Sequence, residues 1–117
     1  MHPVRKPWTP QSRRELREIL DHPTHERAVQ LAGSRNSAVR ATLAAAHDTP
    51  IGVLIHLSTD AHPDVRAAVA ANPGVAVSVA TMRRLAIDPD PRVRDAVRAN
   101  MNVPVSIYET AGLARTA

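Results

Sequence analysis

A sixteen-residue block occurs three times in this chain, and this repeat constrains the fold more than any other feature. The blocks span residues 31–46, 57–72 and 85–100, they align without gaps, and a fourth block starts at 113–116. Each complete block begins with Leu, has Ser or Asp at its fourth position, and has a Val-Arg pair at positions nine and ten. The block starts lie 26 or 28 residues apart, a period that is typical of stacked helical repeats rather than of a single globular core.

The same positions of each block predict where a helix begins. Position six is Asn36, His62 or Asp90, and position seven is Ser or Pro. Such polar side chains cap the first free amides of a helix, and Pro at the first helical position loses no hydrogen bond. Val at position nine is followed by apolar residues three or four positions later, which is the spacing of one helical face. We therefore predict a helix in every block.

The segments between the blocks predict partner helices, which gives four helix pairs. The predicted helices lie near residues 11–20, 24–32, 37–46, 50–58, 63–72, 77–87, 91–99 and 105–114. The first linker, residues 47–56, is two residues shorter than the next, so we expect a tighter turn or a 3₁₀ stretch there. Asn72 before a Pro predicts a helix end with Asn in the left-handed conformation. Ser12 and Glu15 resemble a capping box, and residues 75–79 come closest to a strand pattern.

Composition limits the kind of protein that this chain can be. The length of 117 residues suits one domain, and we expect a basic arm at residues 1–10 before a helical-repeat domain at residues 11–117. Phe is absent and the apolar residues are mainly Ala, Val, Leu and Ile, so small side chains on closely spaced helices must fill the interior. Cys is absent, which excludes disulfide bonds and thiolate sites. With neither a secretory signal nor a membrane span in the sequence, we expect a cytoplasmic protein.

Two runs resemble a known repeat family. They are DAHPDVRAAVAANP, from Asp60, and DPDPRVRDAVRAN, from Asp88, and they are similar to the leucine-rich repeat variant family, itself similar to HEAT-type repeats. The resemblance covers residues 31–116, and it implies an all-α fold: a right-handed α-solenoid of about four short antiparallel helix pairs, in which some helices are 3₁₀. Ser34 and Ala46 depart from the Asp and Asn of the other blocks. A cysteine cluster that would bind iron and sulfur is absent, and no cofactor is expected.

The Arg of the Val-Arg pair has two interpretations. Arg40, Arg66 and Arg94 recur once per block, and a row of them could follow a phosphate backbone. Alternatively, Asp60 and Asp88 lie six residues before Arg66 and Arg94 and could accept hydrogen bonds from them, which would make the series structural. We favour the structural interpretation, because residues at fixed repeat positions usually serve stacking. Arg40 has Ser at the corresponding upstream position, so we predict that it is the free member.

Other basic residues are candidates for contact with a macromolecule. They are Arg5, Lys6, Arg13, Arg14 and Arg17 near the start of the chain, and Arg83, Arg84 and Arg98 farther along. The net charge is +4, and fourteen of the fifteen basic residues are Arg, which can bind phosphate or carboxylate with two hydrogen bonds. A basic arm at the start of the chain is thus a candidate contact surface.

The sequence gives no positive sign of enzymatic activity. His22 and His25 are the only closely spaced histidines, and they lack the Glu and the third ligand of a zinc site. Neither a Gly-rich phosphate loop nor a GxSxG motif is present. We expect a protein without catalytic residues, bound metal or cofactor.

Three functional hypotheses remain after these exclusions. The leading hypothesis is a scaffold that binds another protein on the extended face of its helix stack. The alternative is nucleic-acid binding through the basic arm and the Arg-rich ridge. The third is a homodimer that forms through the last repeat, where Val105, Tyr108 and Leu113 would lie on a helix that no further repeat covers.

Overall fold

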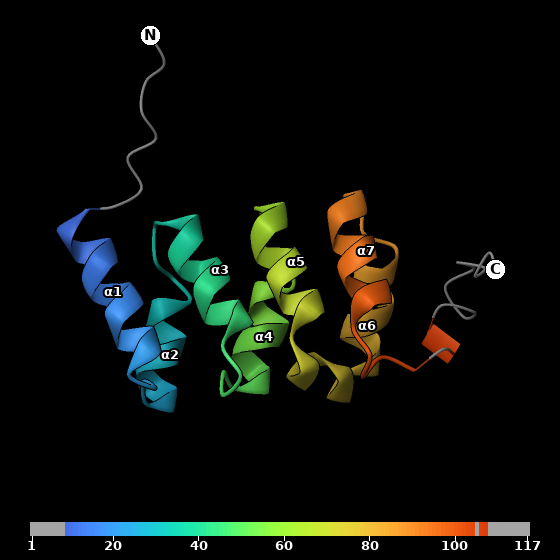
Figure 1. Cartoon of the computed structure of the whole chain (residues 1–117), viewed down its shortest axis with the longest axis horizontal. Helices are drawn as coiled ribbons and strands as arrows, with labels where there is room; N and C mark the ends of the chain where they lie inside the picture. Colours follow the sequence, from blue (N-terminus) through green and yellow to red (C-terminus); the bar gives the residue numbers. More distant parts are fainter. Residues whose placement is uncertain (1–8, 105, 108–117) are drawn as a thin grey trace, which may run out of the picture.

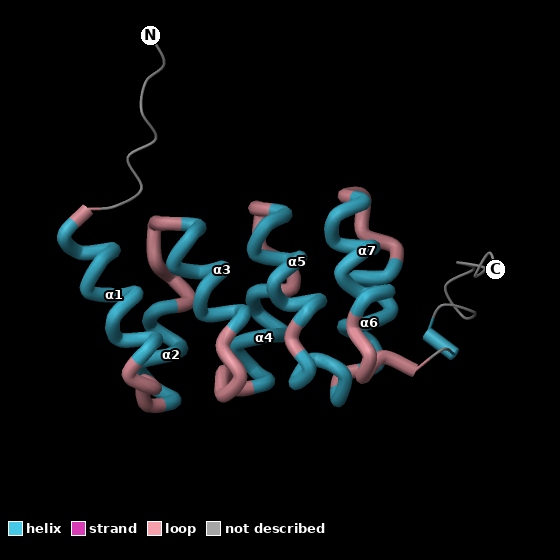
Figure 2. The backbone as a smooth tube through the Cα atoms, in the orientation of Figure 1, coloured by secondary structure: helices cyan, strands magenta, loops and turns pink. Residues whose placement is uncertain are grey.

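The computed structural model describes residues 9–104 and 106–107, and this part of the chain is all-helical, as predicted. Four helices lie side by side in one row (Figure 1): α1 (Pro10–Leu20), α3 (Ser37–Ala45), α5 (Pro63–Ala71) and α7 (Pro91–Ala99). A second row contains α2 (His25–Leu31), α4 (Ile51–Leu57) and α6 (Val79–Ala86), with a 3₁₀ helix, η1 (Pro73–Val77), before α6. The chain alternates between the two rows through short loops (Figure 2).

Each first-row helix packs against the next one in chain order. The helix α3 contacts both α1 and α5, and α5 contacts α7. Second-row helices fill the spaces behind them, since α4 contacts α3 and α5 while α6 contacts α5 and α7. Both α3 and α5 therefore lie between two other first-row helices.

The side chains at block position six begin the first-row helices as predicted. Asn36, His62 and Asp90 are the N-caps of α3, α5 and α7. Each accepts a hydrogen bond from the amide two residues later, at 2.8, 3.2 and 2.8 Å respectively. These bonds satisfy amides that have no partner inside the helix, so the block sequence determines where each helix starts.

The start of α1 differs from the prediction. Thr9, not Ser12, is the N-cap, and its hydroxyl oxygen accepts the Ser12 amide at 3.0 Å. Glu15 therefore closes no capping box. It is 8% exposed and accepts the hydroxyl of Ser34 at 2.9 Å, because α1 buries this face against the turn before α3.

Of the two structures predicted for the shorter linker, the tighter turn is found and the 3₁₀ stretch is not, since the 3₁₀ helix lies in the longer linker. In the shorter linker α4 begins directly after Pro50, whereas the longer linker contains η1. The additional residues are accommodated by one 3₁₀ turn that places Val75 in the core, fully buried. Residues 75–79 thus form no strand, and the described part of the chain contains none.

The predicted apolar faces form the core. The fully or almost fully buried residues at equivalent block positions, exposed by 0–1%, are Leu31, Leu57 and Leu85 at position one, and Val39, Val65 and Val93 at position nine. Ala44 and Ala70, at position fourteen, are also fully buried, where the small side chain permits close approach of the following first-row helix. Among the described residues, none of the helices is long and apolar enough to cross a membrane.

Candidate binding surfaces

The repeat arginines join each block to the next one. Arg40 donates from Nε to Oδ2 of Asp60 at 2.7 Å, and from Nη2 to Oδ1 of the same carboxylate at 3.1 Å. Its Nη1 donates to the backbone carbonyl of Ser34 at 2.8 Å. The side chains of the ion pair are only 18% and 9% exposed. Arg40 is thus held by its own block on one edge of the guanidinium and by the following block on the other.

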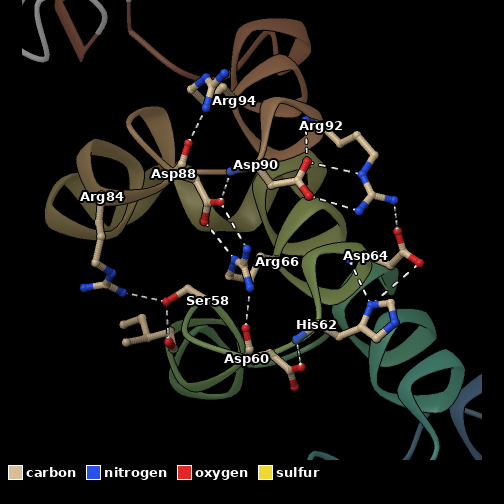
Figure 3. Close-up of polar contacts among 11 residues, drawn as sticks. Ser58, Asp60, His62, Asp64, Arg66, Arg84, Asp88, Asp90, Arg92 and Arg94 are labelled. Atoms are coloured by element: carbon tan, nitrogen blue, oxygen red, sulfur yellow. Dashed lines mark hydrogen bonds and ion pairs between the residues drawn. The ribbon is translucent and has the colours of Figure 1, made fainter.

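Arg66 repeats this geometry one block later. Its Nε and Nη2 donate to Asp88 at 2.8 and 3.1 Å, and its Nη1 donates to the backbone carbonyl of Asp60 at 2.8 Å (Figure 3). The hydrogen bond to Asp88 raises the pKa of Arg66 above its ordinary value. Burial acts to raise the pKa of Asp60, but hydrogen bonds from Arg40 and from the His62 amide lower it overall. The charged forms of Arg66 and of Asp60 are therefore favoured.

These Arg-Asp bridges correct the predicted pairing. The carboxylates of Asp60 and Asp88 bind the arginine of the preceding block, while the arginine of their own block binds their backbone carbonyl. Each carboxylate also accepts the amide two residues later at 2.9 Å, which orients it toward the preceding block. Arg40 is not the free member. Within residues 9–104 and 106–107, Arg94 is the repeat arginine without a carboxylate partner, and its Nη1 donates only to the carbonyl of Asp88, at 2.6 Å.

A second series of bridges joins the C-terminal ends of the first-row helices. Asn72 donates from Nδ2 to the carbonyls of Ala44 and Ala46 at 2.8 and 2.9 Å. Asn100 donates to the carbonyls of Ala70 and Asn72 at 2.9 and 3.2 Å. The last carbonyls of a helix have no partner inside it, so each Asn satisfies two of them in the preceding block. Asn72 has φ −75° and ψ 125°, an extended rather than the predicted left-handed conformation, because its side chain must reach the neighbouring helix.

The Asn and Arg-Asp bridges explain the departures of the first block. A block needs Asp at position four and Asn at position sixteen only when a block precedes it. The first block follows α1 and α2 instead, and it has Ser34 and Ala46 at those positions. The Ser34 side chain donates to Glu15 in α1, whereas the Asp side chains at this position accept from an arginine of the preceding block.

Two further contacts join neighbouring blocks at the surface. Arg92 donates to Asp64 at 3.0 Å, and both side chains are 60% exposed (Figure 3). Arg84 donates from Nη2 to Oγ of Ser58 at 2.6 Å. An exposed ion pair contributes little to stability, whereas the buried Arg-Asp bridges are both oriented and shielded.

The basic residues that the sequence predicted as contact residues lie on separate helices and do not form one patch. Six of them are exposed in the structure, on α1, α6 and α7: Arg13, Arg14, Arg17, Arg83, Arg84 and Arg98. Arg98 lies 3.8 Å from Asp95. Arg5 and Lys6 are outside the described residues.

A polar concavity of about 1220 Å³ lies between α1, α2 and the turn before α3. Its lining includes Arg14, Arg27 and Arg35. Arg27 binds Glu18 with two hydrogen bonds of 2.6 and 2.8 Å, while Arg14 and Arg35 form no salt bridge with another described residue. Sequence analysis missed Arg27 and Arg35. Arg35 was detectable, since it occupies block position five, where the other blocks have Ala61 and Pro89.

The second row presents an apolar and cationic surface, which we define by Ile51, Ile55, Val77 and Val79 together with His56, Arg83 and Arg84. The four apolar side chains are 38%, 40%, 75% and 45% exposed. Ile51 and Val79 stand six residues before the block leucine, and Ile55 and Arg83 stand two residues before it, so each pair has equivalent places on α4 and α6. The 3₁₀ helix η1 contacts both helices. No Asp or Glu occurs in α4, η1 or α6.

One histidine of the closely spaced pair contacts a carboxylate. His22 contacts the carboxylate of Asp48 at 2.8 Å through Nδ1, and both side chains are at least half exposed. Among the described residues, no group of three potential metal ligands comes together.

The three residues of the self-association hypothesis, Val105, Tyr108 and Leu113, lie outside the described residues, and the hypothesis stays a prediction.

Comparison of the chain with family models, with curated proteins and with solved structures found no match.

Proposed function

We propose that this chain is a short, right-handed α-solenoid in which each block adds one helix pair, and that it binds another protein without acting as an enzyme. The packing of first-row helices in chain order supports this architecture. The Arg-Asp and Asn bridges support it too, because each of them joins one block to its neighbour. The resemblance to the leucine-rich repeat variant family favours the same arrangement, and we propose membership on that basis.

The observation that supports protein binding is the apolar and cationic surface of the second row. Exposed aliphatic side chains at repeated positions are typical of protein interfaces when polar residues surround them. The surface has Arg83, Arg84 and His56 as well as the aliphatic residues, and the elements that form it, α4, η1 and α6, contain no Asp or Glu. A complementary partner would be a protein segment that places apolar side chains beside Asp or Glu. Arg-Asp bridging of Arg40 and Arg66, by contrast, removes two repeat arginines from contact with a phosphate backbone.

The test compares how tightly the wild-type chain and variants of this surface bind the same partner protein. We expect Ile55→Asp or Arg83→Glu to weaken binding of the specific partner about tenfold or more, because central interface residues dominate binding energy. Partners captured from the native host by the immobilised wild-type chain would be titrated against each variant by isothermal calorimetry. Circular dichroism would confirm folding, since both replaced side chains are exposed.

The matched control is Leu20→Asp, which changes an aliphatic side chain of α1 that is 74% exposed. This variant should bind as the wild type does. Equal binding by Ile55→Asp and the wild type, or equal loss by Leu20→Asp, would refute the assignment to the second-row surface.

A second candidate function is nucleic-acid binding at the concavity of α1, α2 and α3. The observation that favours it is that Arg14 and Arg35, which are 21 positions apart in the sequence, line the same concavity and have no salt bridge within the described residues. A positively charged concave surface attracts a phosphate backbone.

Fluorescence anisotropy with labelled duplex DNA and single-stranded RNA tests this second function. At about 50 mM salt we expect the double variant Arg14→Glu, Arg35→Glu to bind at least tenfold more weakly than the wild type, with a shallower salt dependence. Arg13→Glu, which changes an exposed residue outside the concavity, is the control for a single charge. Failure of the wild type to bind at low salt would eliminate this function.

A further inference from the structure

The guanidinium of Arg94, on α7, has the orientation in which the other repeat arginines bind a carboxylate. In the first two complete blocks, Arg40 and Arg66 use the same three donors in the same way: Nη1 binds a backbone carbonyl of the same block, and Nε with Nη2 binds the aspartate of the following block. The two sets of distances agree within 0.1 Å, at 2.7 and 3.1 Å for one carboxylate and 2.8 and 3.1 Å for the other. A carboxylate is therefore the group that this arrangement selects.

Arg94 has the first half of this arrangement. Its Nη1 donates to the carbonyl of Asp88 at 2.6 Å, which holds the guanidinium as its counterparts are held. Figure 3 shows Arg66 linked to both Asp88 and the Asp60 carbonyl, whereas Arg94 is linked only to a backbone carbonyl. Nε and Nη2 of Arg94 have no carboxylate partner in the part of the chain that the structure describes. At the corresponding position of the next block start, the sequence has Thr116, which contains no carboxylate.

A second cation stands on the same helix face. Arg98 lies four residues after Arg94, a spacing that places both side chains on one side of α7. It occupies block position fourteen, where Ala44 and Ala70 are fully buried and their backbone carbonyls accept hydrogen bonds from Asn72 and Asn100 of the following block. The Arg98 side chain is 51% exposed, and its distance of 3.8 Å from Asp95 leaves it weakly paired. A long cationic side chain at this position excludes another helix at the spacing of α5 and α7, and it favours an acidic ligand.

We propose that Arg94 and Arg98 form a binding site for a carboxylate-bearing segment of a partner protein. One Asp or Glu of the partner would accept two hydrogen bonds from Nε and Nη2 of Arg94, as Asp60 and Asp88 do from the preceding arginines. A second acidic residue would lie beside Arg98. The site is separate from the second-row surface, so the two proposals can fail independently.

The first test observes the arginine side chains directly. In proton-nitrogen NMR spectra of the full chain, we expect the Nε–H signals of Arg40 and Arg66 to exchange slowly with water and that of Arg94 to exchange quickly. Titration with hexa-aspartate peptide should shift the Arg94 signal and slow its exchange, while the other two stay unchanged. Slow exchange at Arg94 in the free protein would show that the guanidinium is already occupied, and an unmoved Arg94 signal would show that carboxylates do not bind; either result overturns the proposal.

The second test measures affinity for fluorescein-labelled hexa-aspartate by anisotropy. We expect Arg94→Gln to weaken binding about tenfold and Arg98→Gln about threefold. Two hydrogen bonds between charged groups contribute more binding energy than one nearby positive charge does. The matched control is Arg17→Gln, which removes one exposed positive charge from α1, outside both proposed protein-binding surfaces, and should change affinity less than twofold. Equal losses in all three variants would mean that only net charge matters. Tighter, Arg94-dependent binding of a duplex DNA probe of equal charge would assign the site to phosphate, and both outcomes contradict the proposal.

Discussion

Replacing Ala70 with Arg is expected to abolish cooperative folding. Ala70 is fully buried where α5 meets α7, and its carbonyl accepts the Nδ2 of Asn100 at 2.9 Å. An arginine there would bury an unpaired charge and force the two helices apart. Together these effects cost on the order of 5 kcal/mol or more, which is comparable with the whole stability of a small domain. Thermal unfolding followed by far-UV circular dichroism would show the loss of the transition.

Two substitutions serve as controls for Ala70→Arg. Ala71→Arg introduces the same side chain at the next, exposed position of α5, and it should change the free energy of unfolding by no more than about 0.5 kcal/mol. Arg98→Ala removes the arginine that the last complete block has at the equivalent position, and it should be similarly mild because that side chain is 51% exposed. A cooperative Ala70→Arg variant with the wild-type midpoint would mean that α5 and α7 do not pack as described.

Replacing Asp88 with Ala is expected to lower the free energy of unfolding by about 3 kcal/mol. The carboxylate accepts two hydrogen bonds from Arg66 and one from the Asp90 amide, at 2.8 to 3.1 Å. Arg66, whose side chain is only 16% exposed, would keep a charge that neither a partner nor bulk water compensates. For a chain of this size the midpoint of thermal unfolding should fall by about 10 °C or more.

The control for Asp88→Ala is Asp64→Ala, which also breaks an Asp-Arg pair between adjacent blocks. Asp64 and Arg92 are both 60% exposed, so this change should cost less than about 1 kcal/mol. Urea unfolding of the wild type, of Arg66→Ala and Asp88→Ala singly and of the two combined would give the coupling energy of the bridge, and Asp64→Ala would be measured beside them. Similar losses from Asp64→Ala and Asp88→Ala would contradict a special role for the Arg-Asp bridges.

The candidate surfaces were only partly predictable from the sequence. Ile55 and Arg83 could not be recognised as parts of one surface until α4 and α6 were placed in the same row by η1. Arg14 was predicted as a contact residue, but Arg35, which lines the same concavity, lies in the turn before α3. Whether side chains of different helices lie close together depends on the distance and the offset between those helices. The spacing of residues along the sequence shows neither quantity.

Local chemistry was enough to determine the helices of this protein. Capping by Asn36 and Asp90, and the buried faces of Val65 and Val93, follow from interactions over a few residues, which the sequence displays directly. Tertiary structure decided to which block each Arg, Asp or Asn side chain binds. Arg66 reaches the aspartate of the next block because its own aspartate is turned toward the preceding layer by a bond to a nearby amide, and only the stacking of layers determines that direction.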